Sequence, residues 1–302
     1  MRATMVDGRT GVVVITWQRR AEALEAVRRL TELPERPPIV LVDNGSTDGT
    51  APAVRARFPA VRVVALRENL GAVGRNIGVR ELRTPYVAFC DDDTWWEPGS
   101  LTTAADLLDG YPTIAVLNAR IVVEPGGRDD PIVAELRESP VPGPDWLPGP
   151  AIGSFLAGAS VVRRDAFLDA GGFSSRLWLG GEEELLATDL LSGGWELCYR
   201  DDLVVHHRAS RIREARLRRR VGIRNTLWFT WLRRPLPAAL RRTAFLARTV
   251  PRDRTSALAA WDATRGLPWL VRQRRPRPAA VEARLAPLDA AQRRSTARRY
   301  VG

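Results

Sequence analysis

Short apolar runs alternate with helix-like segments along the first third of the chain. The runs are rich in β-branched residues, as is typical of parallel strands covered on both faces of a sheet. Between them, apolar side chains recur at helical spacing in residues 19–33, 49–57 and 71–82. This βαβαβαβ order predicts an α/β fold with a doubly wound, Rossmann-like and mainly parallel central sheet flanked by helices. The runs are GVVVITW (11–17), PIVLVDN (38–44), VRVVALREN (61–69) and PYVAFCDDD (85–93).

A Pro- and Gly-rich stretch, residues 124–150, interrupts this alternation and predicts a long loop with one short helix. After it, residues 153–173 and 182–195 predict a strand and two short helices, and the pattern of 195–207 predicts another strand. From residue 208 onward the chain is rich in arginine, helical in pattern and broken by prolines. We therefore expect a domain over 1–207 and a helical, arginine-rich C-terminal extension over 208–302.

The net charge divides the chain at the same place. The 302 residues carry a formal net charge of +11, and all 46 basic residues are arginines. Residues 1–207 hold 21 Arg against 30 acidic residues, whereas residues 208–302 hold 25 Arg against 5. The two parts therefore carry about −9 and +20, as expected of a basic appendage on an acidic body. A basic segment of this kind can meet nucleic acid, anionic lipid or an acidic partner.

The composition favours a cytoplasmic protein. No apolar run approaches the roughly 18 residues that a membrane-spanning helix needs, and the N-terminal segment lacks the apolar region of a signal peptide. The two cysteines, Cys90 and Cys198, are too few for a disulfide framework. We expect a cytoplasmic location, with a peripheral position on the inner face of the membrane as a hypothesis that rests on the basic tail.

Polar residues end the four predicted strands. In doubly wound sheets ligands bind beyond the carboxyl ends of the strands, so we expect these side chains to converge on one crevice. A single Asp at such a place most often caps a turn or a helix. Three adjacent carboxylates repel one another, however, and a divalent cation would offset their charge. The strand-end residues are Thr16, Asp43, Asn69 and the triplet Asp91, Asp92 and Asp93.

The aspartate triplet predicts a Mg²⁺ or Mn²⁺ site. Both ions prefer oxygen ligands, and Mg²⁺ is usually held by one or two carboxylates together with substrate phosphates. Alternate residues of an extended segment share a face, which would place Asp91 and Asp93 on one side. One carboxylate would then be free for a ribose and one for a metal on a diphosphate.

Two further segments follow strand ends. DNGSTDGT (43–50) is by itself an ordinary turn that caps the next helix, although Asp43 can also accept an N–H from a base edge. ENLGAVGRNIGV (68–79) places glycines before a helix that carries Arg75 in its first turns. Glycine permits close approach of a ligand, and an arginine at a helix start favours phosphate.

Together, these segments resemble the donor half of a family 2 glycosyltransferase with the GT-A fold. VVVITWQRR, LVDNGSTDGT, ENLGAVGRNIGV and FCDDDTWWEPG occur in the order and spacing of that family, and the resemblance covers roughly residues 10–210. It implies a donor half at about 10–120 and an acceptor half at about 150–207. It also implies inverting transfer of a sugar from a nucleotide-diphosphate donor to an acceptor hydroxyl of a glycan, glycolipid or small molecule.

The resemblance implies donor contacts along the strand ends. Thr16 and Asp43 would lie near the nucleotide base, and Arg75 would lie near the nucleotide. Arg19 and Asn69, which belong to the same motifs, would complete the nucleotide-sugar site.

The resemblance also implies a Mn²⁺ or Mg²⁺ cofactor. Asp91 and Asp92 would face the ribose or diphosphate, and Asp93 would be the metal ligand of the family's aspartate-x-aspartate motif. The family's third metal ligand is a histidine at the place of His206 or His207, the chain's only histidines. In general a strand-end histidine is more often structural than a ligand. Alternation along 199–207 favours His207 for this face, and His206 stays open.

The acceptor half needs a general base, because the attacking hydroxyl must lose its proton. The candidates are the adjacent glutamates Glu182, Glu183 and Glu184, which cannot all face one site because successive helix residues point about 100° apart. Without the other motifs they would be an acidic first turn that complements the helix dipole. The family pattern Glu-Asp-x-Asp-Leu, counted back from the following Gly-Trp pair, puts Glu183 at the base position with Glu182 before it. Glu therefore replaces Asp as the base, and Leu185 replaces the second Asp.

Other functional classes fit parts of the pattern. A sugar-phosphate nucleotidyltransferase has a similar nucleotide-binding sheet, but it needs a glycine-rich phosphate loop where this chain has TWQRRAEALE. A nucleic-acid-binding protein would use the arginine tail, but the acidic first two-thirds argues against nucleic acid as a partner. The intact aspartates and glutamates argue against a catalytically silent scaffold.

The segment RRRVGIRNTLWFTWLRRP (218–235) leaves two interpretations open. Its mixture of Arg with Trp, Leu and Phe is typical of a helix that lies in the interface of an anionic membrane. It equally fits a helix packed on the catalytic domain with a solvated charged face.

Overall fold

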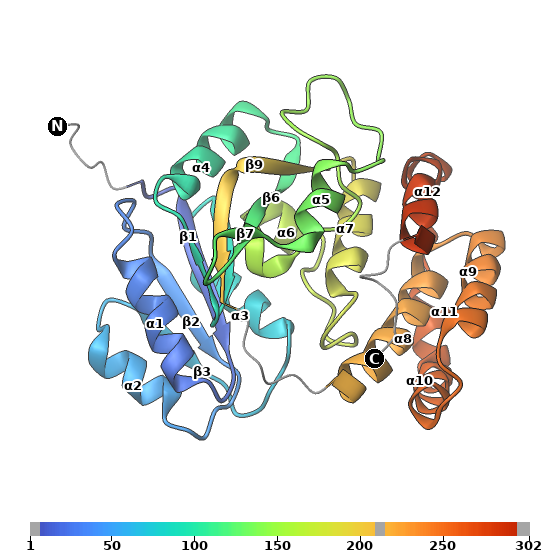
Figure 1. The fold of residues 1–302 in the computed structure, drawn as a ribbon, viewed down its shortest axis with the longest axis horizontal. Coiled ribbons are helices and arrows are strands. Elements are labelled where there is room, and N and C mark those ends of the chain that lie inside the picture. Colours follow the sequence, from blue (N-terminus) through green and yellow to red (C-terminus); the bar gives the residue numbers. More distant parts are fainter. Residues whose placement is uncertain (1–6, 209–214, 295–302) are drawn as a thin grey trace.

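One mixed β-sheet flanked by helices forms the body of the protein, and a group of helices lies at one side of it (Figure 1). The computed structural model describes residues 7–208 and 215–294. The strands follow the order β3-β2-β1-β4-β8-β6-β9-β5, with β7 paired to β6. The predicted α/β class is therefore confirmed. The strands are β1 (Thr10–Thr16), β2 (Ile39–Asp43), β3 (Arg62–Ala65), β4 (Tyr86–Asp91), β5 (Thr94–Trp96), β6 (Ile114–Val123), β7 (Arg128–Asp129), β8 (Ser160–Arg163) and β9 (Glu196–His207).

The first three helices fall in the three predicted segments and cross over between parallel strands. Strand β1 pairs in parallel with β2 and β4, so that Thr16 lies opposite Asp43 and Ile15 lies opposite Asp91. The strand ends therefore meet at one edge of the sheet. The helices up to β9 are α1 (Arg20–Thr31), α2 (Thr50–Arg57), α3 (Val73–Glu81), α4 (Ser100–Gly110), α5 (Pro131–Arg137), the 3₁₀ helix η1 (Ala157–Ala159), α6 (Arg164–Asp169) and α7 (Glu182–Ser192).

The chain turns sharply after Asp91. Residues 92–93 form a turn between β4 and β5, and β5 pairs antiparallel with the end of β9. The expectation that Asp91 and Asp93 share a face is therefore wrong, because it assumed that the strand continues through the triplet.

Strand β6 was not among the predicted strands. It pairs in parallel with β9 and antiparallel with β8, and it lies in the middle of the second half of the sheet. Its sequence, IAVLNARIVV, interrupts an apolar run with Asn118 and Arg120, so that its periodicity does not separate strand from buried helix.

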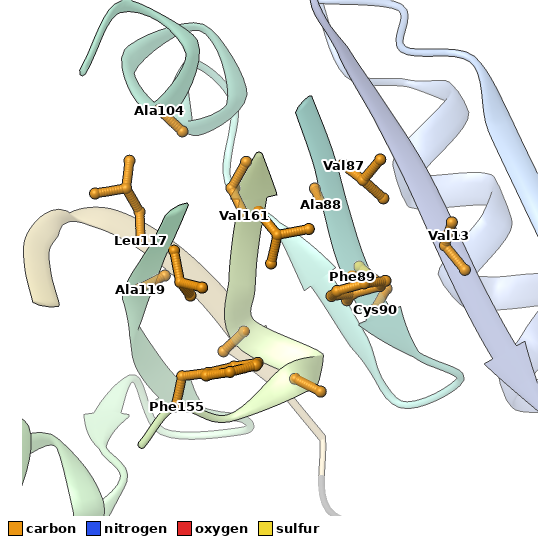
Figure 2. Packing of buried hydrophobic residues seen from close by; sticks show 14 of the residues in the cluster. Val13, Val87, Ala88, Phe89, Cys90, Ala104, Leu117, Ala119, Phe155 and Val161 are labelled. Atoms are coloured by element: carbon orange, nitrogen blue, oxygen red, sulfur yellow. The ribbon is translucent and has the colours of Figure 1, made fainter. Parts of the chain in front are cut away.

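A continuous core lies between the sheet and its helices. Figure 2 shows part of it around Phe89, Val161 and Phe155. Phe89 is fully buried, and its ring centroid lies 5.5 Å from that of Phe167 and 5.8 Å from that of Phe173. Aromatic pairs at these distances add to the free energy gained by burial.

In the described part of the chain, five helices follow β9, and they share a small core with residues that precede β9. Trp228, Phe229 and Leu232 of α8 are buried against Leu177 and Leu185. Of the two interpretations of 218–235, the packed helix is the one observed. Residues 209–214 and 295–302 of the expected 208–302 extension lie outside the described residues. The helices are α8 (Ala215–Arg233), α9 (Leu236–Thr249), α10 (Arg254–Arg265), α11 (Leu267–Gln273) and α12 (Ala279–Arg294).

Within the described ranges, no helix combines the length and the apolar character needed to span a bilayer.

Gly78 allows α3 to pack directly on the sheet. A methyl group at this position would overlap Val13 of β1 and approach Val42 of β2. We expect Gly78→Ala to lower the free energy of unfolding by about 1–3 kcal/mol, because the core must shift to admit the methyl group. Urea unfolding measures this change. Gly110→Ala is the matched control, since no described atom lies within 4 Å of its added methyl group, and it should stay within about 1 kcal/mol of the wild type. An equal loss in both variants would contradict the packing argument.

Candidate active site

Two of the three aspartates share one arginine. Thr16 Oγ1 donates a hydrogen bond of 2.9 Å to Asp92, and Arg19 Nη1 donates to Asp92 at 2.8 Å and to Asp93 at 3.0 Å. Burial raises the pKa of Asp92 to about 7, against the opposing effect of the Arg19 charge. The positive charge of Arg19 therefore offsets the negative charges of Asp92 and Asp93, at the place where the sequence predicts a divalent cation.

Asp91 lies apart from the other two and is paired with Arg75. The Arg75 side chain, only 6% exposed, reaches Asp91 from α3. Gly158 of η1 packs against the other side of this carboxylate, and a methyl group at Gly158 would come within 2.8 Å of Asp91 Oδ2. Asp91 therefore lies between α3 and η1, with its side chain 41% exposed.

Asp43 and Asn69 form hydrogen bonds within their own loops. Asp43 Oδ1 accepts from the backbone N–H of Ser46 at 2.9 Å, and Asn69 Oδ1 accepts from that of Gly71 at 2.8 Å. These are the ordinary turn contacts expected of both residue types. Their contact with a nucleotide stays a prediction.

His207 and Asp93 lie together, and His206 does not join them. The register of β5 and β9 sets Thr94 opposite His207, and His207 Nε2 is 3.8 Å from Asp93 Oδ1. His206 points to the other face, where it stacks on Trp95 and contacts Glu97 and Glu124 at 3.1 Å each.

The donor atoms near Asp93 fit a divalent cation. Asp93 supplies oxygen and His207 supplies nitrogen, a combination that suits Mn²⁺ and that substrate phosphates can complete. In the described part of the chain, no group of three or more His, Cys, Asp or Glu side chains is arranged as a preformed metal site. A metal held by Asp93 and His207 would therefore need further ligands from outside these side chains.

The three glutamates begin α7, where their environments differ. Glu182 is 2% exposed, and its Oε2 atom has no hydrogen-bond partner among the described residues. Burial raises the pKa of Glu182, and it raises the pKa of Glu183 to about 8 with a further contribution from the Glu182 charge. Arg75 opposes both shifts, so its guanidinium acts on the α7 glutamates as well as on Asp91 at the end of β4.

A cavity of about 460 Å³ lies beside Glu183 and Glu184. Its opposite wall comes from the C-terminal helices and holds Arg241, Phe245 and Leu288. No signal in the local sequence predicted these residues, because the contact joins segments far apart in the chain. The cavity offers carboxylates on one side and apolar and cationic groups on the other.

Asn225 of α8 holds the loop that leads into α7. Its Nδ2 atom donates to the backbone carbonyls of Leu177, Leu179 and Gly180 at 2.7, 3.0 and 2.6 Å. The side chain is fully buried, and a methyl group on Gly181 would touch it. A single Asn in an arginine-rich helix gave no signal in the sequence, yet it positions the start of the helix that carries Glu183.

A match to one sequence family covers slightly more than half of the chain. Residues 11–168 match the family described as "Glycosyl transferase family 2". An N-acetylglucosaminyl-diphospho-decaprenol L-rhamnosyltransferase of Mycobacterium tuberculosis (strain H37Rv) is 29% identical over 232 residues, which cover 66% of this chain and 76% of the relative.

Solved structures share the fold. The mannosyltransferase PcManGT from Pyrobaculum calidifontis, in complex with GDP-Man and Mn²⁺, aligns with a TM-score of 0.56 at 20% identity, over 95% of this chain and 77% of its own. S. aureus TarS 1-349 in complex with UDP-GlcNAc aligns with a TM-score of 0.60 at 19% identity, over 97% of this chain and 88% of its own.

Asn225→Ala removes the donor to three backbone carbonyls. We expect it to lower the free energy of unfolding by about 1–3 kcal/mol, because buried carbonyls lose their partner. Ser192→Ala, at the exposed other end of α7, is the control and should change stability by less than about 0.5 kcal/mol. Urea unfolding tests both, and a neutral Asn225→Ala variant would show that the loop does not depend on this side chain.

Proposed function

This chain is a glycosyltransferase that belongs to family 2, and from that premise we propose that it is a metal-dependent, inverting enzyme. Its GT-A fold, predicted from the motifs, is confirmed. The observation that carries the proposal is the convergence of Asp93 and His207 at one end of the aspartate turn, with the Glu182–Glu183 pair linked to the same region through Arg75.

The donor proposed here is a nucleotide-diphosphate sugar bound across the strand ends. GDP-Man and UDP-GlcNAc are bound by the structural neighbours, and the donor of this chain belongs to the same chemical class. Thr16, Asp43 and Asn69 would contact this donor. Arg19, which pairs with Asp92 and Asp93, would turn toward its diphosphate. Arginine forks match phosphate oxygens closely.

A Mn²⁺ or Mg²⁺ ion held by Asp93 and His207 would supply a positive charge that stabilises the departing diphosphate. Glu183 takes the proton from the acceptor hydroxyl as its oxygen forms a bond to the anomeric carbon. The bond from that carbon to the diphosphate oxygen breaks on the opposite face, so that the configuration inverts. Arg75 keeps the ionised form of Glu183 accessible by lowering its pKa.

The acceptor proposed here enters the 460 Å³ cavity between α7 and the C-terminal helices. Carboxylates on the α7 side suit sugar hydroxyls, whereas Phe245, Leu246 and Leu288 suit an apolar chain. The M. tuberculosis relative acts on a sugar carried by a diphospho-decaprenol. A sugar linked to a lipid diphosphate is therefore the acceptor class that we propose.

Two substitutions separate donor binding from transfer. Asp93→Ala should abolish the stabilisation by nucleotide sugars that depends on Mn²⁺, because the oxygen ligand is lost. Glu183→Gln should bind the donor as the wild type does and lower transfer by at least about 10²-fold. A thermal-shift screen of UDP-, GDP- and dTDP-sugars with and without Mn²⁺ measures binding. The proposal fails if no nucleotide sugar stabilises the wild type in the presence of metal.

The rate of transfer should rise with pH. Glu183 acts as a base only when ionised, and its pKa is about 8, so kcat/KM should increase about tenfold per unit from pH 6 and level off near pH 8. Glu183→Gln should remove this ascending limb. A flat profile of kcat/KM between pH 6 and 8 would exclude Glu183 as the base.

The same carboxyl group should make stability depend on pH. Because the folded-state pKa of Glu183 lies above the ordinary value of 4.5, folding favours its protonated form, and the free energy of unfolding falls as the pH rises from about 4.5 to about 8.

A further inference from the structure

A second cavity lies at the corner between α10 and α11, and it shares no lining residue with the larger one. It has a volume of about 280 Å³ and opens at the surface. Three arginines contribute to its walls: Arg265 ends α10, Arg272 lies in α11, and Arg176 comes from the loop before α7. No carboxylate of the described residues lines it. The remaining wall residues are Pro268, Trp269 and Gln273.

Close packing fixes the shape of this corner. Gly266 joins the two helices, and any side chain there would overlap the indole of Trp228. Trp228 donates a hydrogen bond of 3.0 Å from Nε1 to the carbonyl of Ala263, and its ring meets Trp269 edge-on at 5.4 Å. The guanidinium of Arg176 lies 5.9 Å from the centre of the Trp269 ring. The cavity is therefore built on a buried, rigid support.

The carboxylates of the C-terminal helices form their direct ion pairs with other arginines, although the charge of Arg265 contributes to the lowered pKa of Asp262. Asp262, one turn before Arg265, accepts two hydrogen bonds from Arg220 at 2.6 and 2.9 Å. Among residues 7–208 and 215–294, Arg176, Arg265 and Arg272 form no direct ion pair. Three guanidinium groups around one cavity without a contacting carboxylate are the arrangement expected of a site for an anion. The other engaged carboxylates are Asp253, Glu282 and Asp289.

Exposed apolar side chains adjoin the arginines on α11. Leu267 is 54% exposed and Val271 is 76% exposed. They form one row along the helix, and Pro268 and Arg272 form the neighbouring row. Apolar side chains beside arginines are the arrangement of a helix at a membrane interface, where the apolar groups enter the lipid and the arginines reach the phosphates.

We propose that this cavity, bounded by Arg176, Arg265 and Arg272, binds the phosphate of an anionic membrane lipid while Leu267 and Val271 enter the interface. The contact lies on α11 and not on 218–235, whose tryptophans are used in packing. A nucleic acid fits this surface less well, because it would leave Leu267 and Val271 without an apolar partner. In addition, the Trp269 ring, on which a base would stack, already contacts Trp228 and Arg176. The inference is independent of the proposed catalytic roles.

Vesicle co-sedimentation of the full chain tests this assignment. We expect binding to phosphatidylcholine vesicles that contain about 30 mol% phosphatidylglycerol, and binding at least about tenfold weaker to pure phosphatidylcholine. Arg265→Ala/Arg272→Ala should lose at least about tenfold more affinity than Arg248→Ala/Arg252→Ala, which removes the same charge from exposed positions outside the cavity. Val271→Ser should weaken binding without changing its salt dependence.

A lysine pair distinguishes a shaped phosphate site from diffuse charge attraction. Arg265→Lys/Arg272→Lys keeps the charge and should still lose about threefold or more, because lysine lacks the planar fork. Unchanged melting temperatures and unchanged stabilisation by nucleotide sugar show that the variants are folded. Equal losses in the cavity pair and the control pair would overturn the proposal in favour of diffuse charge attraction. It would also be overturned if inorganic phosphate or a single-stranded oligonucleotide bound at the cavity while the anionic vesicles did not.

Discussion

The candidate active site depends on the attraction between the buried guanidinium of Arg75 and the carboxylates around it. This guanidinium reaches from α3 to Asp91 at the end of β4, and its charge acts on Glu182 and Glu183 at the start of α7. Carboxylates removed from water without a counter-charge are strongly unfavourable. The charge of Arg75 therefore offsets part of the repulsion between Asp91 and the glutamates at the start of α7.

The helices after β9 complete the catalytic part structurally. Asn225 anchors the loop before α7, Arg233 pairs with Asp189, and Arg284 pairs with Glu196. These ion pairs thus join the acidic first two-thirds of the chain to its arginine-rich last third. Within the described ranges, three arginines that form no ion pair line the smaller cavity at the α10–α11 corner.

Much of the fold could be predicted because the first half depends on local patterns. The apolar runs, the helical spacing and the order of the motifs predicted the strands that carry Thr16, Asp43 and Asp91, and the family that they resemble is confirmed. Strand β6 was missed because its partners β8 and β9 lie far along the chain. The face of Asp93 was predicted wrongly because a turn replaces the strand. The contact of Asn225 with the 177–180 loop could not be predicted, because nothing in the sequence of α8 indicates it.

The pairing of β5 with β9 decides which of two adjacent histidines faces Asp93. A slip of one residue would exchange His206 and His207, since neighbouring side chains point to opposite faces. The stack of Trp95 on His206, with Glu97 and Glu124 at the imidazole nitrogens, holds the present register. By holding His206 on one face of β9, Trp95 therefore also determines that His207 is the histidine that lies beside Asp93.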